Sequence, residues 1–226
     1  MPRTARVVVP NYPYHITQRG NYRQKIFENE ENRFKYLNWI NEYSKKYNLT
    51  LLAYCLMDNH VHFIVNPGKE HSLAKVFSIV HMRYSQYFNK KSGSTGHLWQ
   101  GRFYSCLLDE LHLMAAMRYV EKNPVRARLV RKAWEWGWSS AAGHIGKSKE
   151  IIELGDMNNI VDLGEKGWEQ YLESDEIEEE LEKIRRNTML GRPLGTPRFI
   201  EEVEKKLGRV IRVLPRGRPR KKRMNK

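Results

Sequence analysis

Two strand-like runs separated by only two residues constrain the fold of this chain most. Residues 49–57 and 60–66 are both rich in apolar side chains, and Asp58 and Asn59 lie between them. Two connecting residues are typical of a tight turn between antiparallel strands. The pattern therefore predicts a β-hairpin over residues 49–66.

Helical and strand-like patterns alternate on both sides of this hairpin. β-Branched and aromatic residues predict strands over residues 12–19 and 102–108. Apolar residues at helical spacing predict helices over residues 30–43, 71–88 and 111–123, with Asn29 capping the first and Pro124 ending the third. This order predicts an α+β fold with a ferredoxin-like antiparallel sheet and helices on one face.

Charge is unevenly distributed along the chain, which carries a formal net charge of +14. Residues 1–145 hold 21 basic and 10 acidic side chains, residues 146–184 hold 4 and 13, and residues 185–226 hold 15 and 3. We therefore expect a compact domain over residues 1–147, an acidic helical insert or linker over 148–184, and a basic C-terminal tail over 185–226. The two basic parts indicate a polyanionic partner, most simply nucleic acid, unless they are only a solvated surface.

The cellular location also follows from composition. The longest uncharged apolar stretch, residues 49–57, is too short to span a bilayer, and the N-terminal residues lack the apolar core of a signal peptide. The two cysteines, Cys55 and Cys106, cannot form a disulfide framework or a four-thiolate zinc site. We expect a cytoplasmic protein without a membrane helix.

A pair of histidines, His60 and His62, begins the second strand of the hairpin. Side chains two apart on a strand share a face, with α-carbons roughly 6.5–7 Å apart, so both imidazoles can reach one metal ion. The zinc motifs HExxH and Cys-x-x-Cys are absent from the sequence. The alternative is a pair of histidines that simply lie on an exposed sheet face.

A tyrosine and an asparagine lie four residues apart on the third expected helix. That spacing puts Tyr119 and Asn123 on one helical face. If this face covers the sheet near His60 and His62, the Asn123 oxygen can join the two imidazoles as a ligand. Such a set suits Mg²⁺ or Mn²⁺, and Tyr119 would be the nucleophile toward a phosphodiester. The alternative for Tyr119 is an ordinary core tyrosine.

Four stretches of the sequence surround these candidate residues. In chain order they are YHITQRGNYRQKIF, YCLMDNHVHFIV, HLWQGRFYS and RYVEKNPVRARLV. They resemble the REP-associated tyrosine transposases, relatives of the single-strand transposases of the smallest bacterial insertion sequences. The resemblance implies an HUH-type core, in which His60 and His62 form the histidine–hydrophobe–histidine motif. It places the nucleophile at Tyr119 and the amide metal ligand at Asn123. Two departures are Arg128, where a glycine is common, and the acidic segment 146–184.

The resemblance also implies an activity, a nucleoid-associated location and a state as monomer or homodimer. The enzyme would cleave and rejoin single-stranded DNA at hairpin-forming repetitive palindromes, through a covalent 5′-phosphotyrosine intermediate that releases a 3′-hydroxyl. Basic side chains must then hold the strand, and we expect Arg19, Arg23, Arg102, Arg118, Arg126 and Arg128 in this role. Tyr104 is a candidate for stacking on unpaired bases, whereas core packing is the expected fate of Trp99.

The basic tail carries a second DNA-binding signal. Residues 215–219 (PRGRP) match the core of an AT-hook, and residues 191–193 repeat half of it. Glycine lets such a segment approach the floor of the minor groove, and arginines enter where the potential is most negative. The residues concerned are Arg192, Arg216, Arg218 and Arg220. We expect binding to the hairpin stem, with nonspecific phosphate attraction as the alternative.

Two other questions remain open from sequence. The chain is alternatively a domesticated regulator that binds DNA or RNA without catalysis, although the aromatic-rich strand of RNA-recognition modules is missing. The acidic run 173–182 is either a solvated helix or a segment that lies across the basic groove and competes with DNA.

Overall fold

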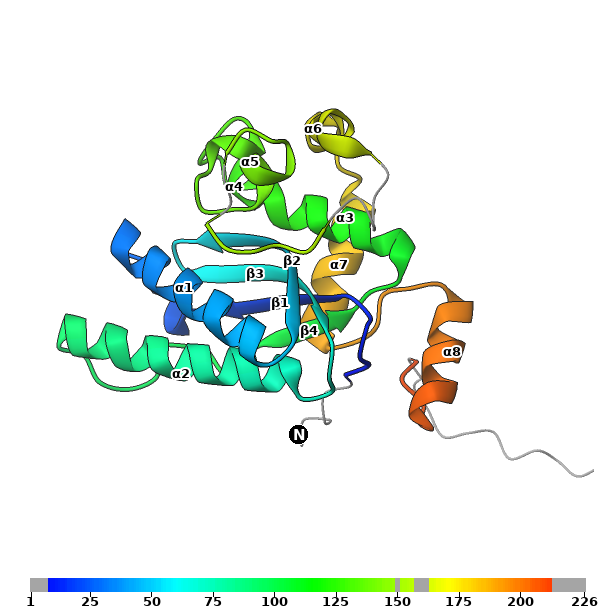
Figure 1. Ribbon diagram of the computed structural model, residues 1–226, viewed down its shortest axis with the longest axis horizontal. Helices are drawn as coiled ribbons and strands as arrows, with labels where there is room; N and C mark the ends of the chain where they lie inside the picture. The colour runs from blue at the N-terminus through cyan, green and yellow to red at the C-terminus, as the bar shows by residue number, and fades with distance from the viewer. Residues whose placement is uncertain (1–7, 149–150, 157–162, 213–226) are drawn as a thin grey trace, which may run out of the picture.

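A four-stranded antiparallel sheet forms the centre of the structure (Figure 1). This computed structural model describes residues 8–148, 151–156 and 163–212. The strands are β1 (Tyr14–Arg19), β2 (Leu49–Met57), β3 (His60–Pro67) and β4 (Tyr104–Leu107), in the spatial order β2-β3-β1-β4. The predicted hairpin is the β2–β3 pair, with Met57 opposite His60 and a turn at Asp58 and Asn59. The α+β class and the antiparallel sheet are therefore confirmed.

Two long helices, α1 (Glu30–Lys46) and α2 (Ser72–Ser92), cover one face of this sheet. Asn29 caps α1 as predicted, because its side-chain oxygen accepts a hydrogen bond from the Asn32 backbone N–H at 3.0 Å. Tyr36 of α1 and Phe77 of α2 are fully buried with Phe63 of β3. This aromatic core fixes both helices on the sheet.

The third helix, α3 (Glu110–Glu121), lies on the opposite face of the sheet. Ala116 and Val120 of α3 belong to one buried cluster with Cys55 of β2 and Ile64 of β3. The prediction that the helices share one face therefore holds for α1 and α2 and is wrong for α3. The reason is that nearly every side chain of β2 is buried, so both faces of the sheet need an apolar cover.

The helical conformation is interrupted at the C-terminal end of α3. Helix α3 ends at Glu121, two residues earlier than predicted, and a short helix, α4 (Asn123–Arg126), follows after Lys122. Pro124 lies in the first turn of α4, where its missing N–H costs no helical hydrogen bond. Three shorter elements follow or precede this region, namely η1 (Asn21–Arg23), η2 (Ala133–Glu135) and α5 (Ala141–His144).

The acidic segment and the start of the basic tail form three further helices. These are α6 (Gly164–Glu173), α7 (Glu178–Leu190) and α8 (Pro197–Leu207). Leu181 and Ile184 of α7 are buried in the α3 cluster, and the Leu194 N–H donates to the Leu107 carbonyl of β4 at 2.8 Å. Helix α7 thus runs across residue 184, where we placed a boundary, and the three-part division stays a prediction.

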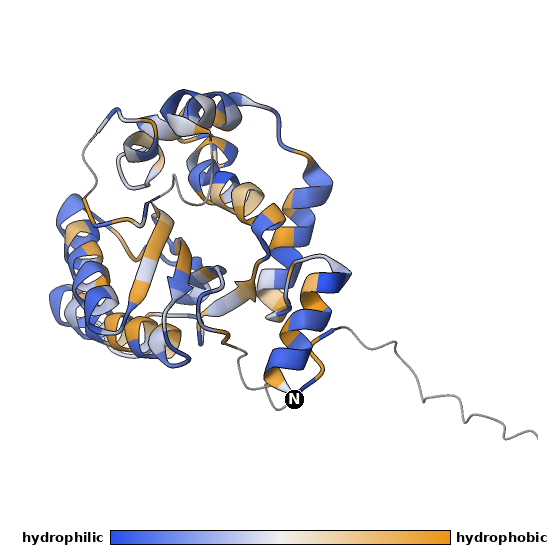
Figure 2. Cartoon of the chain, turned by 45° about the vertical axis from the view of Figure 1, so that its right-hand side comes forward, coloured by the Kyte–Doolittle hydropathy of each residue, from blue (hydrophilic) through white to orange (hydrophobic). Residues whose placement is uncertain are grey.

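Hydropathy follows this arrangement, since apolar residues concentrate on the strands and on the inner sides of the helices (Figure 2). Within the described ranges no helix is long and apolar enough to cross a membrane. Residues 215–219 and their arginines lie outside the described part of the chain.

Candidate active site

Strand β3 presents the two predicted histidines side by side. The imidazole rings of His60 and His62 lie with their centroids 5.0 Å apart, edge to face. The Nδ1 atom of His60 is 2.6 Å from Oδ1 of Asn59, and Nδ1 of His62 is 2.8 Å from Nε2 of His15. Each ring is thus oriented through Nδ1, which leaves Nε2 as the atom for a ligand.

Burial sets the charge of both rings. It lowers the pKa of His60 to about 4, with a smaller contribution from the positive charge of Arg19. Burial also lowers the pKa of His62 well below its usual range. Both imidazoles are therefore neutral at pH 7, which is the form that binds metal ions.

A third histidine, His15 of β1, was not predicted from sequence. Its ring stacks on His62 at 5.1 Å between centroids, and its Nδ1 lies 2.8 Å from Oγ1 of Thr188 on α7. His15 is almost completely buried, and burial lowers its pKa to about 3. It is the kind of partner that orients a metal-ligating histidine. Its position in a predicted strand was visible, but the register of β1 against β3, which brings its ring to His62, was not.

Helix α3 brings Tyr119 against these rings. The Tyr119 ring lies edge-on to His15 and His62, at centroid distances of 5.6 and 5.7 Å. Tyr119 is only 7% exposed. The structure therefore places the candidate nucleophile directly beside the histidine pair.

Asn123, the first residue of α4, makes side-chain hydrogen bonds to the last turn of α3. Its Nδ2 donates to the backbone carbonyls of Tyr119 and Val120, at 3.0 and 3.1 Å. Its Oδ1 is the atom left for a metal ion. No hydrogen bond joins Asn123 to His60 or His62 in the described ranges.

Other side chains do not complete a metal site on their own. Among the residues that the structure describes, no three His, Cys, Asp or Glu side chains cluster in a way that could hold a metal ion. A site at the histidine pair therefore depends on the amide oxygen of Asn123 or on oxygens of the substrate.

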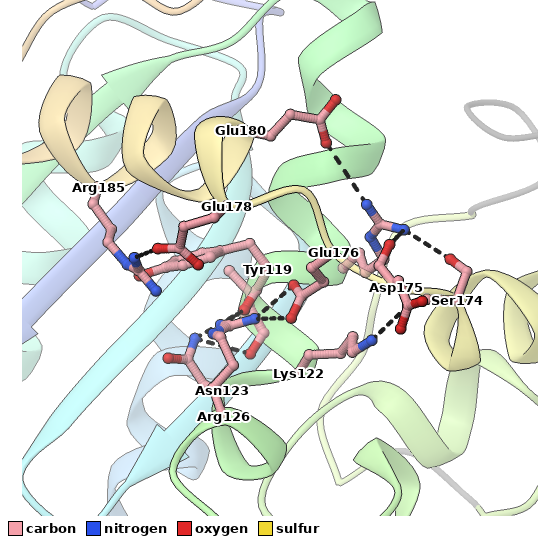
Figure 3. Close-up of polar contacts among 12 residues, drawn as sticks. Tyr119, Lys122, Asn123, Arg126, Ser174, Asp175, Glu176, Glu178, Glu180 and Arg185 are labelled. Carbon is pink, nitrogen blue, oxygen red and sulfur yellow. Dashed lines mark hydrogen bonds and ion pairs between the residues drawn. The ribbon is translucent and has the colours of Figure 1, made fainter.

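Two guanidinium groups lie over the Tyr119 ring (Figure 3). Arg126 lies 4.3 Å from the ring centroid and donates to the Tyr119 carbonyl, whereas Arg185 of α7 lies 5.9 Å away. Both are already paired: Arg126 donates to the two oxygens of Glu176 at 2.7 and 3.0 Å, and Arg185 donates to Glu178 at 2.6 Å. The acidic segment therefore covers the candidate nucleophile in this conformation.

Comparison with protein families identifies the family of this chain. A family model described as "Transposase IS200 like" matches residues 8–123, which include both histidines, Tyr119 and Asn123. The chain belongs to this family of IS200-like transposases. The resemblance to transposases drawn from the sequence is thereby confirmed.

One solved structure shares the fold of this transposase, and a second is a weaker match. One is described as the structure of a REP-associated tyrosine transposase bound to a REP hairpin, with 18% identity and a TM-score of 0.52, covering 69% of this chain and 93% of that one. Another is a putative transposase from Deinococcus radiodurans, with 15% identity and a TM-score of 0.36, covering 57% of this chain and 92% of that one. Among curated proteins none matches the chain with significance.

The remaining arginines of this transposase differ in exposure. Arg19, Arg23, Arg102 and Arg128 are exposed, and Arg192 is partly exposed. Arg118 is buried, because it donates to Ser174 at 2.8 Å and lies over the Tyr171 ring at 4.2 Å. Arg216, Arg218 and Arg220 lie outside the described residues.

The structure also locates three other residues that the sequence analysis named. Trp99 is buried, and its indole N–H donates to the His81 carbonyl, so it packs in the core as expected. Tyr104 is partly exposed. Arg128 has a φ of 58°, a left-handed conformation that glycine adopts without strain, which accounts for glycine being common at this position.

Proposed function

We propose that this transposase cleaves and rejoins single-stranded DNA at hairpin-forming repetitive palindromes, with Tyr119 as the nucleophile and Mg²⁺ or Mn²⁺ as the cofactor. One observation carries the proposal: the Tyr119 ring lies against His62, one of two neutral imidazoles whose Nε2 atoms remain for a ligand. A hairpin-bound transposase with the same fold supports hairpin DNA as the substrate.

The reaction follows from the chemistry of a phenol oxygen. Oη of Tyr119 attacks the phosphorus and the bond from phosphorus to the 3′-oxygen breaks, so the DNA on the 3′ side of the break is joined to Tyr119 through its 5′-phosphate. The phenolic proton is lost and the departing 3′-oxygen gains one. Rejoining is the reverse attack by a 3′-hydroxyl, and it needs no ATP because the phosphotyrosine conserves the energy of the original bond.

The residues present fit a divalent cation. His60 and His62 would hold it through Nε2, and Asn123 through Oδ1, with open positions for phosphate oxygens. The ion, when bound, polarises the phosphate and stabilises its developing charge. Arg126, over the Tyr119 ring, is placed to bind the same phosphate once Glu176 releases it.

The histidine pair provides the test. The protein is incubated with Mn²⁺ and a hairpin oligonucleotide that carries a single-stranded flank, and a covalent adduct is sought on a denaturing gel. We expect His60→Ala to abolish the adduct while binding persists, because the basic groups remain. Asn123→Ala should be milder, since water can replace an amide oxygen. His71→Ala, an exposed histidine at the start of α2, is the matched control. Unimpaired cleavage by His60→Ala would reject the site.

A second candidate function is DNA or RNA binding without catalysis. The observation that favours it is the cover over Tyr119, whose ring is 7% exposed beneath Arg126 and Arg185. A regulator of this kind would bind hairpins tightly and yield no adduct with any of them, whichever cation is supplied.

A further inference from the structure

The loop that follows β1 continues directly from the histidine site. Arg19, the last residue of β1, lies opposite His60 in the β1–β3 register. The Gly20 N–H donates to the Asn59 carbonyl at 2.8 Å. The Asn59 side chain then holds both neighbours, since its Nδ2 donates to the Arg23 carbonyl at 3.2 Å and its Oδ1 contacts His60. The Asn59 side chain therefore links the loop of residues 20–24 to His60, the candidate metal ligand.

This loop holds two consecutive residues in a strained backbone conformation. Tyr22 has a φ of 50° and Arg23 a φ of 58°, in the left-handed region that side chains other than glycine seldom adopt. Such strain persists only where the surroundings impose it, and it concentrates at functional positions.

The surroundings of the loop do impose its shape. The Leu98 carbonyl accepts hydrogen bonds from the Asn21 N–H at 2.7 Å and from Nε2 of Gln24 at 3.2 Å. Gly20 is required by close packing, because a Cβ there would lie 2.6 Å from the Gln24 carbonyl oxygen. The loop is thus anchored on both sides of Tyr22.

The anchored loop presents an aromatic ring to solvent. Tyr22 is 93% exposed, more than any other large apolar side chain in the described ranges. Arg19 and Arg23 beside it are exposed, and within the described ranges neither pairs with a carboxylate. A ring carried on an anchored backbone costs little loop-ordering entropy on binding, and flanking arginines supply attraction for phosphates.

We propose that Tyr22 is a stacking platform for an unpaired nucleobase in the single-stranded DNA that flanks the hairpin. The inference rests on the proposed function, because the ligand is the strand that leads to Tyr119. Every base offers a π-face, so the contact holds the strand near His60 without selecting a particular sequence. Arg19 and Arg23 bind the phosphates on either side of the stacked base.

The test compares two DNA substrates by fluorescence anisotropy without a divalent cation, so that binding is measured whether or not the protein cleaves. One is a hairpin with a single-stranded flank and the other is the same hairpin with blunt ends. Tyr22→Ala should weaken binding of the flanked hairpin by about tenfold and leave the blunt hairpin unchanged. Tyr22→Trp should bind both as the wild type does, and Leu111→Ala, which removes an exposed apolar side chain on α3, is the control.

Abasic substitutions locate the stacked base. In the wild type, one flank position should lose about tenfold in affinity when its base is removed, and in Tyr22→Ala the same removal should cost nothing further. Tyr22→Gly, which accepts a φ of 50° without strain, serves if Tyr22→Ala does not fold. Wild-type affinity in Tyr22→Ala or Tyr22→Gly would overturn the proposal. So would an equal loss of affinity for both substrates, or an abasic effect that adds to that of Tyr22→Ala at every flank position. Failure to form an adduct would instead count against Tyr119 as the nucleophile.

Discussion

Replacing Glu176 by glutamine should tighten the binding of single-stranded DNA. The Glu176 carboxylate accepts two hydrogen bonds from Arg126, at 2.7 and 3.0 Å, and its side chain is only 9% exposed. Arg126 in turn lies over the Tyr119 ring. If the acidic run competes with DNA, this pair is the contact that a phosphate must displace.

The expected size of the effect follows from the charge-assisted hydrogen bonds. Such bonds contribute about 1.5–3 kcal/mol, and an amide oxygen retains part of that, so Glu176→Gln should favour the released segment by about 1.5 kcal/mol. Apparent affinity scales with the fraction of molecules that can bind, and 1.4 kcal/mol corresponds to a factor of ten. We therefore expect the dissociation constant for a flanked hairpin to fall by roughly tenfold.

The assay is an anisotropy titration at low salt, with Glu179→Gln as the matched control. Glu179 lies on the same segment and loses the same charge, but it pairs with Lys183 on the surface of α7. Wild-type affinity in Glu176→Gln would show that the acidic run is only a structural or solvated segment. Equal gains in the two variants would reduce the effect to net charge.

Three further predictions concern other parts of the chain. His15→Phe should weaken Mn²⁺ binding, measured by electron paramagnetic resonance, by about 10- to 100-fold, because His62 loses the partner at its Nδ1; unchanged affinity would contradict this. His81 is buried, which lowers its pKa to about 3, so its stabilising contribution is complete above about pH 6.5 and declines as the pH falls toward 3. In His81→Gln, the loss of unfolding free energy between pH 6.5 and 4.5 should shrink by about 1.4 kcal/mol per pH unit in denaturant titrations, and an unchanged slope would refute it. Deleting residues 215–226 should reduce affinity for hairpins more than for unstructured strands, whereas equal losses would leave a nonspecific tail.

Local patterns predicted most of the central elements. The two-residue connection at Asp58 and Asn59 specified the hairpin, and Asn29 marked the start of α1 through its side-chain cap. Both signals lie within a few residues of chain, so the sequence expresses them directly. The same holds for the spacing that put His60 and His62 on one strand face.

Features that depend on distant contacts were not predictable in this way. The apolar stripe of α3 showed that one side of the helix is buried, but not which face of the sheet buries it. His15 became a site residue only through the pairing of β1 with β3, which brings it within 2.8 Å of His62. Likewise, the acidic run allowed the hypothesis that it lies across the basic groove, but it did not specify that Glu176 pairs with Arg126, 50 residues earlier.

The central claim is that Tyr119 forms a covalent bond with DNA, and mass spectrometry of the adduct tests it most directly. The protein is incubated with Mn²⁺ and a flanked hairpin, digested with nuclease and trypsin, and searched for a nucleotide-bearing peptide. The account predicts that the peptide of residues 119–122 carries the phosphate on its tyrosine, and that Tyr119→Phe forms no adduct. An adduct that persists in Tyr119→Phe, or a phosphate mapped to another residue, would contradict it.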